Sequence, residues 1–241
     1  MTELLYQTNS YLKTFDATIT SRNEEDRSIQ LDRTAFYPGG GGQPFDQGTI
    51  DCADIKYPVF KVKKIGTDAL HFLGGTEPIP EIRQNISGLI DWERRYQLMR
   101  THTGMHILCG VIFRDYGASV TGGDMDLLKG RMDFEFETLR AEFVHKIEEA
   151  VNIEIQKDHE ICINILPREE AFKIPDLIRT KINLLPEGIE FVRTVEIKGL
   201  DLQADGGTHV NRTSEVGKIN IVDYKSKGAI NKRFYVEITD K

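Results

Sequence analysis

Hydrophobic and polar positions alternate in short runs over the first third of the chain. Residues 15–20, 28–31 and 57–62 follow this pattern, with Gly, Pro and Asp residues between them. Alternation with a period of two predicts strands with one buried face, and the turn residues keep those strands short. Residues 85–90 alternate in the same way. The pattern therefore predicts a small β-barrel over residues 1–90.

A helical pattern replaces the alternation after the last of these strands. Asp91 is a typical N-cap residue, and the apolar residues that follow it recur at spacings of three and four. This spacing predicts a helix over about residues 92–113. A second amphipathic pattern predicts a helix over about residues 138–155.

The rest of the chain mixes strand and helix signals. Four further runs alternate like strands: residues 161–166, 189–197, 218–222 and 234–238. Pro167 and the charged residues after it predict the start of a short helix. Residues 91–241 are therefore expected to form a second domain, and the whole chain an α+β fold.

Composition limits the class of protein. With 241 residues, of which 39% are hydrophobic, the chain is long enough for two domains with packed cores. No apolar run approaches the roughly 20 residues that cross a bilayer, and the N-terminus lacks the features of a signal peptide. The three cysteines are widely spaced, so buried, reduced thiols are expected. We expect a cytoplasmic protein without a membrane partner.

The charge distribution bears on nucleic-acid binding. The net charge of −7 argues against a general attraction to nucleic acid. Residues 210–241 are nevertheless locally basic, with seven Lys and Arg residues against four Asp and Glu residues. Any contact with RNA must therefore be local. A solvated strand face is the alternative explanation of this segment.

Two motifs far apart in the chain carry side chains that are typical of metal sites. His102 and His106 lie four residues apart in the first predicted helix, which places both imidazoles on one face. Asp205 and His209 flank a Gly-Gly-Thr sequence, whose glycines permit a turn. Three imidazoles and a carboxylate suit zinc and also other divalent metals. Taken singly, each motif also fits surface histidines or a Gly-rich turn.

Three segments together resemble a known family. Residues 91–106 read DWERRYQLMRTHTGMH, residues 206–210 read GGTHV, and residues 34–48 read TAFYPGGGGQPFDQG. In this order and spacing they are similar to the editing domain of alanyl-tRNA synthetase and to its free-standing relatives, the AlaX proteins of the medium-length class. The resemblance covers nearly the whole chain and is specific, because three independent motifs carry it.

The resemblance implies a translation-factor-like N-terminal β-barrel and an editing domain of the threonyl- and alanyl-tRNA synthetase type. It implies ATP-independent hydrolysis of mischarged tRNA(Ala), chiefly seryl-tRNA(Ala), with glycyl-tRNA(Ala) as a second candidate. This activity serves translation fidelity. One Zn²⁺ per chain would be held by His102, His106, Asp205 and His209. A monomer and a homodimer both remain open.

One position departs from the family pattern. The second motif usually reads Cys-Gly-Gly-Thr-His, and Asp205 stands where the cysteine ligand is expected. We expect Asp205 to ligate the metal and to make a harder site. Two alternatives are that Asp205 only orients a histidine, or that metal binding is lost. Loss of the metal would leave a noncatalytic tRNA-binding module.

The expected reaction assigns roles to individual residues. Cleavage of an ester needs an attacking water and a stabilised oxyanion, for which His102 and His106 are the catalytic candidates together with the metal. A pocket that accepts serine cannot exclude the smaller alanine by size, so a hydrogen bond to the serine hydroxyl must discriminate. Thr121 is the candidate for this bond, and a simple turn threonine is the alternative. A zincin peptidase is disfavoured, because no Glu lies between the histidines.

Basic residues near the motifs predict contacts with the acceptor end of tRNA(Ala). These predicted contacts are Arg94, Arg95, Arg100, Lys225, Lys227, Asn231 and Arg233. Pairing with acidic neighbours is the alternative for the first three. The Gly-rich loop of Gly40, Gly41, Gly42 and Gln43 lacks the ending of a P-loop. The resemblance makes it a loop that faces the editing site, and a Gly-rich hairpin is the alternative.

Overall fold

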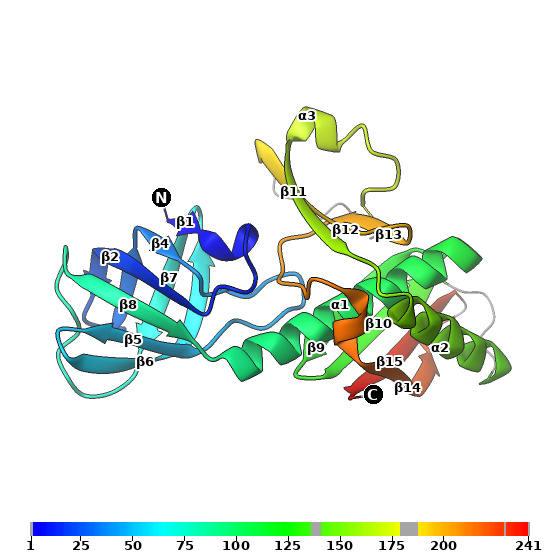
Figure 1. Cartoon of the computed structure of the whole chain (residues 1–241), viewed down its shortest axis with the longest axis horizontal. Helices are drawn as coiled ribbons and strands as arrows, with labels where there is room; N and C mark the ends of the chain where they lie inside the picture. The colour runs from blue at the N-terminus through cyan, green and yellow to red at the C-terminus, as the bar shows by residue number, and fades with distance from the viewer. Residues whose placement is uncertain (1, 136–140, 179–187, 229, 241) are drawn as a thin grey trace. The chain divides into compact units, whose positions relative to one another are not determined.

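The computed structural model describes residues 2–135, 141–178, 188–228 and 230–240 (Figure 1). The chain divides into two compact units, Met1–Gln97 and Leu98–Lys241. The division falls within a long helix, α1 (Trp92–Tyr116). Each unit buries its own set of apolar side chains.

A closed barrel forms the first unit. Its strands are β2 (Thr14–Asn23), β3 (Ser28–Leu31), β5 (Gly48–Cys52), β6 (Ile55–Ile65), β7 (Asp68–Leu73) and β8 (Asn85–Ile90). They close in the order β2-β3-β7-β6-β5-β8, with every neighbouring pair antiparallel. Two short strands, β1 (Glu3–Leu4) and β4 (Arg33–Thr34), pair in parallel, and the 3-10 helix η1 (Leu5–Gln7) follows β1. The predicted small β-barrel is confirmed.

Alternation along the strands accounts for the core of the barrel. In β8, Ile86, Gly88 and Ile90 are buried, and the residues between them are exposed. Glycine is required at position 88, because a Cβ there would lie 2.3 Å from the ring of Phe15. The inward side chains form one apolar cluster that also includes Phe36. The period of two in the sequence therefore reflects side chains that point alternately to the inside and the outside of the barrel.

A four-stranded antiparallel sheet belongs to the second unit. Its strands are β9 (Val120–Asp126), β10 (Lys129–Glu135), β14 (Lys218–Ser226) and β15 (Asn231–Thr239), in the order β14-β15-β10-β9. Helix α2 (Ala141–Gln156) packs against β14, where the Asn152 side chain bonds both backbone groups of Ile219. The predicted start of this helix at residue 138 lies outside the described residues.

A smaller antiparallel sheet has the order β11-β12-β13. Its strands are β11 (Ile161–Pro167), β12 (Phe191–Ile197) and β13 (Asp201–Ala204). The short helix α3 (Arg168–Ala171) follows β11, as Pro167 predicts, and the 3-10 helix η2 (Thr213–Val216) leads into β14. Strand β13 was not predicted, because its sequence Asp-Leu-Gln-Ala is only four residues long and contains a single large apolar residue.

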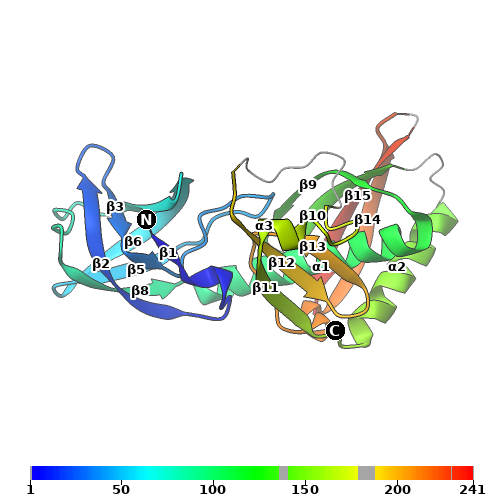
Figure 2. The same ribbon diagram turned by 90° about the horizontal axis from the view of Figure 1, so that it is seen from above.

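Helix α1 lies between the two sheets of the second unit (Figure 1, Figure 2). Every residue from 98 to 112 is buried, so this part of the helix has no solvent face. Two glycines permit the strands to approach the helix closely. A Cβ on Gly104 would lie 3.0 Å from Ile219 Cδ1 of β14, and a Cβ on Gly110 would lie 2.9 Å from Asp201 Cβ, at the start of β13. Strands therefore enclose the helix from both sides.

Local signals fix the two ends of α1. The Asp91 carboxylate accepts a hydrogen bond from the backbone N–H of Arg94 at 3.1 Å, which confirms the predicted N-cap. Gly117 has a φ of +63°, and its N–H donates to the Phe113 carbonyl. This left-handed glycine ends the helix.

None of the described helices is long and apolar enough to cross a membrane. All three thiols are free. Cys52 and Cys109 are buried as predicted, whereas Cys162 of β11 is half-buried, which corrects the prediction for that residue.

Candidate metal centre

Helix α1 and the loop after β13 bring together three histidines and one aspartate. The rings of His102 and His106, one helical turn apart, have centroids separated by 5.0 Å. His209 stacks on His102 with a centroid distance of 4.3 Å and an interplanar angle of 24°. With Asp205, these residues offer ligand atoms that all lie within 4.8 Å of one another. Two motifs about a hundred residues apart thus meet at one point, as their residue types predict.

The three rings turn the same nitrogen toward Asp205. Its Oδ1 lies 3.5 Å from His102 Nε2 and 3.9 Å from His106 Nε2, and its Oδ2 lies 3.0 Å from His209 Nε2. Tetrahedral zinc with bonds of about 2.0–2.1 Å separates its ligand atoms by roughly 3.4 Å. The distances from the three Nε2 atoms to the carboxylate oxygens lie on both sides of this value. The donor set therefore fits a tetrahedral divalent ion.

Hydrogen bonds hold the Asp205 carboxylate in one orientation. Its Oδ2 accepts a bond from the backbone N–H of Gly207 at 2.8 Å and lies 3.5 Å from Nη1 of Arg193. The same Nη1 donates to the backbone carbonyl of Asp205 at 2.9 Å. With Oδ2 occupied in this way, Oδ1 is the oxygen directed at His102 and His106.

Burial and charge set the protonation of the cluster. Burial lowers the pKa of His102 to about 4, and burial together with the neighbouring His102 holds the pKa of His209 well below its ordinary value. Burial alone would raise the pKa of Asp205, but its interactions with His102 and His209 outweigh burial and hold that pKa well below its ordinary value. These three groups are therefore in their metal-binding forms at neutral pH.

His106 differs from the other two histidines. Burial acts to lower its pKa, but the carboxylates of Asp201 and Asp205 outweigh burial and raise the pKa above its ordinary value. A cation bound at Nε2 competes with a proton at this ring.

Several residues around the cluster were not predicted. Nδ1 of His209 lies 3.1 Å from the hydroxyl of Thr103, which also accepts the backbone N–H of Val210. Asp201 and Arg193 are buried beside the cluster. The Asp-x-Gln-x-Asp spacing of residues 201–205 could have found part of this set, because it predicts three polar side chains on one face of a strand.

Thr121 is not grouped with these residues. Its hydroxyl donates to Asn231 Oδ1 at 2.9 Å. Asn231 alternates along β15 with buried residues such as Phe234 and Ile238, so it belongs to the opposite face of that strand. Helix α1 packs on the buried face, where Gly104 approaches Ile238. The described contacts give the predicted bond from Thr121 to serine no support.

The predicted tRNA contacts on α1 are engaged within the protein. Arg95 is fully buried and bonds the buried carboxylate of Asp46, so the prediction that it contacts tRNA is wrong. Arg100 is 8% exposed and donates to the Val216 carbonyl at 3.0 Å, which corrects that prediction in the same way. Arg94 donates to the Phe45 carbonyl at 3.2 Å. Sequence alone suggests exposed arginines here because their partners are distant in the chain.

The predicted contacts near the C-terminus lie on the β14–β15 hairpin. Arg233 forms two hydrogen bonds to Asp133, at 2.6 and 2.7 Å. Lys225 is exposed and lies 3.0 Å from Asp223, and Lys227 is also exposed. The two lysines are therefore the accessible cations of the predicted set on this hairpin.

The Gly-rich loop is a tight hairpin. Gly40 and Gln43 exchange two backbone hydrogen bonds, at 3.0 and 2.9 Å. Gly41 and Gly42 between them have φ values of +57° and +89°, which type I′ turns require. Strand β5 follows the loop, where a phosphate-binding loop would lead into a helix.

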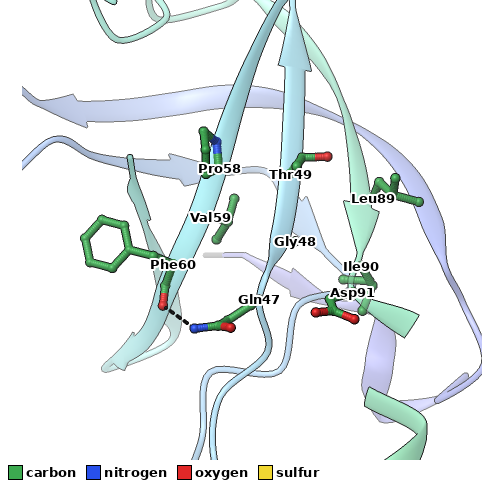
Figure 3. Close-up of a pocket in the computed structure, with 9 residues that line it drawn as sticks. All are labelled: Gln47, Gly48, Thr49, Pro58, Val59, Phe60, Leu89, Ile90 and Asp91. Atoms are coloured by element: carbon green, nitrogen blue, oxygen red, sulfur yellow. Dashed lines mark hydrogen bonds between the residues drawn. The ribbon is translucent and has the colours of Figure 1, made fainter. Parts of the chain in front are cut away.

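The barrel unit carries a surface pocket of about 420 Å³ between β5, β6 and β8 (Figure 3). Pro58, Phe60 and Leu89 give it apolar walls, and Gln47 donates to the Phe60 carbonyl at 3.2 Å. Its one carboxylate, Asp91, caps helix α1. The lining therefore holds no group of side chains that could act in catalysis, in contrast to the cluster around Asp205.

Comparison with known protein families agrees with this organisation. The family described as the threonyl and alanyl tRNA synthetase second additional domain matches residues 192–235, which include Asp205 and His209. The family described as class II (A) tRNA synthetases matches residues 6–94. Fold and site together define a protein related to the editing region of tRNA synthetases.

Individual relatives identify the family more closely. The alanyl-tRNA editing protein AlaX-M of Saccharolobus solfataricus is 38% identical over 99% of both chains, and that of Methanosarcina barkeri is 34% identical over the full length of both. The alanine–tRNA ligase of Ignicoccus hospitalis is 38% identical over 92% of this chain, but over only 24% of the ligase. The chain belongs to the AlaX-M family of alanyl-tRNA editing proteins, which confirms the predicted resemblance.

Proposed function

We propose that this protein is a metal-dependent hydrolase that removes wrongly attached amino acids from tRNA(Ala) in trans. Seryl-tRNA(Ala) is the chief proposed substrate, and glycyl-tRNA(Ala) is the second. The observation that carries the proposal is the convergence of three Nε2 atoms on the Asp205 carboxylate in a buried cluster. Full-length similarity to alanyl-tRNA editing proteins supports the substrate class. We expect the protein to act in the cytoplasm, as a monomer or a homodimer.

Zn²⁺ is the proposed metal, one per chain. His102, His106 and His209 would hold it through Nε2, and Asp205 would hold it through Oδ1. An oxygen ligand in place of a thiolate makes the site harder, so it should also accept Co²⁺ and Mn²⁺. When bound, the metal supplies a Lewis acid that polarises the ester carbonyl or activates a water molecule.

The residues of the chain position the ligand side chains and exclude water from the cluster. The hydrogen bonds of Asp205 Oδ2 fix the carboxylate, and Thr103 fixes the ring of His209. Burial keeps the rings of His102 and His209 in their neutral, ligating form. Selection of serine over alanine still requires a polar partner for the serine hydroxyl, since size cannot exclude alanine.

The accessible lysines of the β14–β15 hairpin are the proposed contacts to the tRNA backbone. Lys225 and Lys227 are exposed, and an ammonium group suits contact with phosphate. The overall charge of −7 makes such a local patch necessary for binding a polyanion.

Multiple-turnover deacylation tests the proposal. We expect release of serine from seryl-tRNA(Ala) by substoichiometric protein, slower release of glycine from glycyl-tRNA(Ala), and no release of alanine from alanyl-tRNA(Ala). Binding of tRNA without turnover would instead support the noncatalytic binding module, to which the Cys-to-Asp departure at position 205 points.

A further inference from the structure

Strand β13 and the residue after it direct three polar side chains to one side. Asp201, Gln203 and Asp205 alternate along the strand, and alternate residues point to the same face. Asp205 faces the three histidines, so Gln203 and Asp201 face α1 as well. Their contacts agree, because Gln203 Nε2 donates to Asp201 Oδ2 at 2.6 Å and lies 3.3 Å from Cys109 Sγ of α1.

Asp201 lies beside the outer nitrogen of His106. Its Oδ2 is 3.7 Å from His106 Nδ1, while Nε2 of the same ring faces Asp205. The Asp201 side chain has no exposed surface. His106 Nδ1 is also buried and has no partner within hydrogen-bonding distance in the part of the chain that the structure describes.

A glycine creates the space for this contact. Gly110 follows His106 by one helical turn and lies on the same face of α1. A Cβ on Gly110 would lie 2.9 Å from Asp201 Cβ, closer than real Cβ contacts. Glycine at this position therefore lets β13 approach α1 where Asp201 meets His106.

A metal bound at Nε2 determines the protonation of Nδ1 and therefore the partner that Nδ1 needs. A neutral imidazole that ligates through Nε2 carries its proton on Nδ1, and a buried N–H requires an acceptor. A shift of roughly 0.8 Å brings Asp201 Oδ2 from 3.7 Å to the usual N–H···O distance of about 2.9 Å. A carboxylate in this place orients the ring and makes Nε2 a better ligand.

We infer that Asp201 is a positioning residue for the metal centre, which holds His106 with Nε2 turned inward, and that Gln203 orients Asp201. This inference rests on the proposed metal site, and it adds a role for residues outside the four ligands. Asp201 touches neither the metal nor the substrate in this account.

Metal affinity of the purified full-length protein tests the inference without tRNA. Zn²⁺ is titrated in competition with a chromophoric chelator, and the absorption spectrum of the Co²⁺-loaded protein reports the ligand geometry. We expect Asp201→Asn to weaken Zn²⁺ binding roughly 10–100-fold and to change the Co²⁺ spectrum. Asp133→Asn is the matched control, because Asp133 is also buried but bonds Arg233 on β15. This control should leave both readouts unchanged.

The outcomes separate the inference from the proposed function. Unchanged Zn²⁺ affinity and an unchanged Co²⁺ spectrum in Asp201→Asn would overturn the inference and leave the metal site standing. Failure of the unmodified protein to bind Zn²⁺ would overturn both. If Asp201→Asn does not fold, Gln203→Ala decides, since it keeps the carboxylate but removes its donor. Weaker Zn²⁺ binding by Gln203→Ala supports the inference, and unchanged binding contradicts it.

Discussion

The guanidinium of Arg95 lies against the carboxylate of Asp46, and neither side chain has any exposed surface. Arg95 Nε lies 2.9 Å from both carboxylate oxygens, and Nη1 donates to the Ser10 carbonyl at 3.0 Å. Asp46 also accepts the backbone N–H of Tyr37 at 2.6 Å. The pair therefore ties the first turns of α1 to both ends of the segment that contains the Gly-rich turn.

Removing Arg95 should strongly destabilise the barrel unit. Arg95→Met leaves the Asp46 carboxylate buried without its partner, and breaking a buried pair costs about 3–5 kcal/mol of unfolding free energy. Urea unfolding measures this loss. Arg33→Met is the control, because the exposed Arg33 lies 3.7 Å from Glu3, and such surface pairs contribute about 0–1 kcal/mol. Equal stability of the two variants would contradict the assigned role of Arg95.

Restoring cysteine at position 205 should change the metal preference. Asp205→Cys replaces a carboxylate with a thiolate, which zinc prefers over an oxygen ligand more strongly than Mn²⁺ does. We expect tighter Zn²⁺ binding and weaker Mn²⁺ binding than in the unmodified protein. Competition titrations with both ions check this, and an unaltered ratio of the two affinities would show that residue 205 is not a ligand.

A buried carboxylate at the end of α2 should make stability depend on pH. Glu154 accepts hydrogen bonds from Arg114 at 2.6 Å, Lys157 at 2.9 Å and His159 at 2.8 Å. Burial alone would raise the pKa of Glu154, but these hydrogen bonds outweigh burial and lower the pKa from 4.5 to about 2. A lowered pKa stabilises the folded state above pH 4.5, and this contribution disappears as the pH falls toward 2.

Glu154→Gln should therefore lose about 1–3 kcal/mol of unfolding free energy at pH 7. The difference from the unmodified protein should shrink as the pH falls from 4.5 toward 2. Urea unfolding at a series of pH values measures both quantities. A difference that stays constant over this range would show that Glu154 has an ordinary pKa in the folded protein.

Loss of the hairpin lysines should weaken tRNA binding and its dependence on salt. Each phosphate contact to a single strand contributes about 0.7 to the slope of log affinity against log salt. We expect a Lys225→Ala, Lys227→Ala double variant to bind tRNA(Ala) more weakly and with a shallower slope. Lys146→Ala on α2, an exposed lysine paired with Glu142, is the control and should bind normally. Equal slopes for all three proteins would place the tRNA contact elsewhere.

Features set by neighbouring residues were predictable from the sequence. Strand β8 has the predicted bounds, because its alternation and the Asp91 cap that follows are both local signals. The pairing of His102 and His106 also follows from helical spacing alone. Four-residue spacing could not show what the helix packs against, however, so the burial of both faces of α1 was found only in the structure.

Features set by distant residues were not predictable in the same way. Arg95 looks like an exposed helix arginine until Asp46, 49 residues earlier, is placed beside it. The role of Asp201 depends on the approach of a short polar strand to Gly110. Hydrophobic periodicity carries no information about either contact, because both join polar or small residues across the fold.

Deacylation of seryl-tRNA(Ala) by the unmodified protein and by His102→Ala is the most direct test of the proposed activity. Alanyl-tRNA(Ala) is the substrate control, and chelation followed by addition of Zn²⁺ is the metal control. We expect rapid release of serine but not of alanine, loss of release in His102→Ala or after chelation, and recovery with Zn²⁺. Release of serine at an unchanged rate by His102→Ala would contradict a catalytic role for the metal centre.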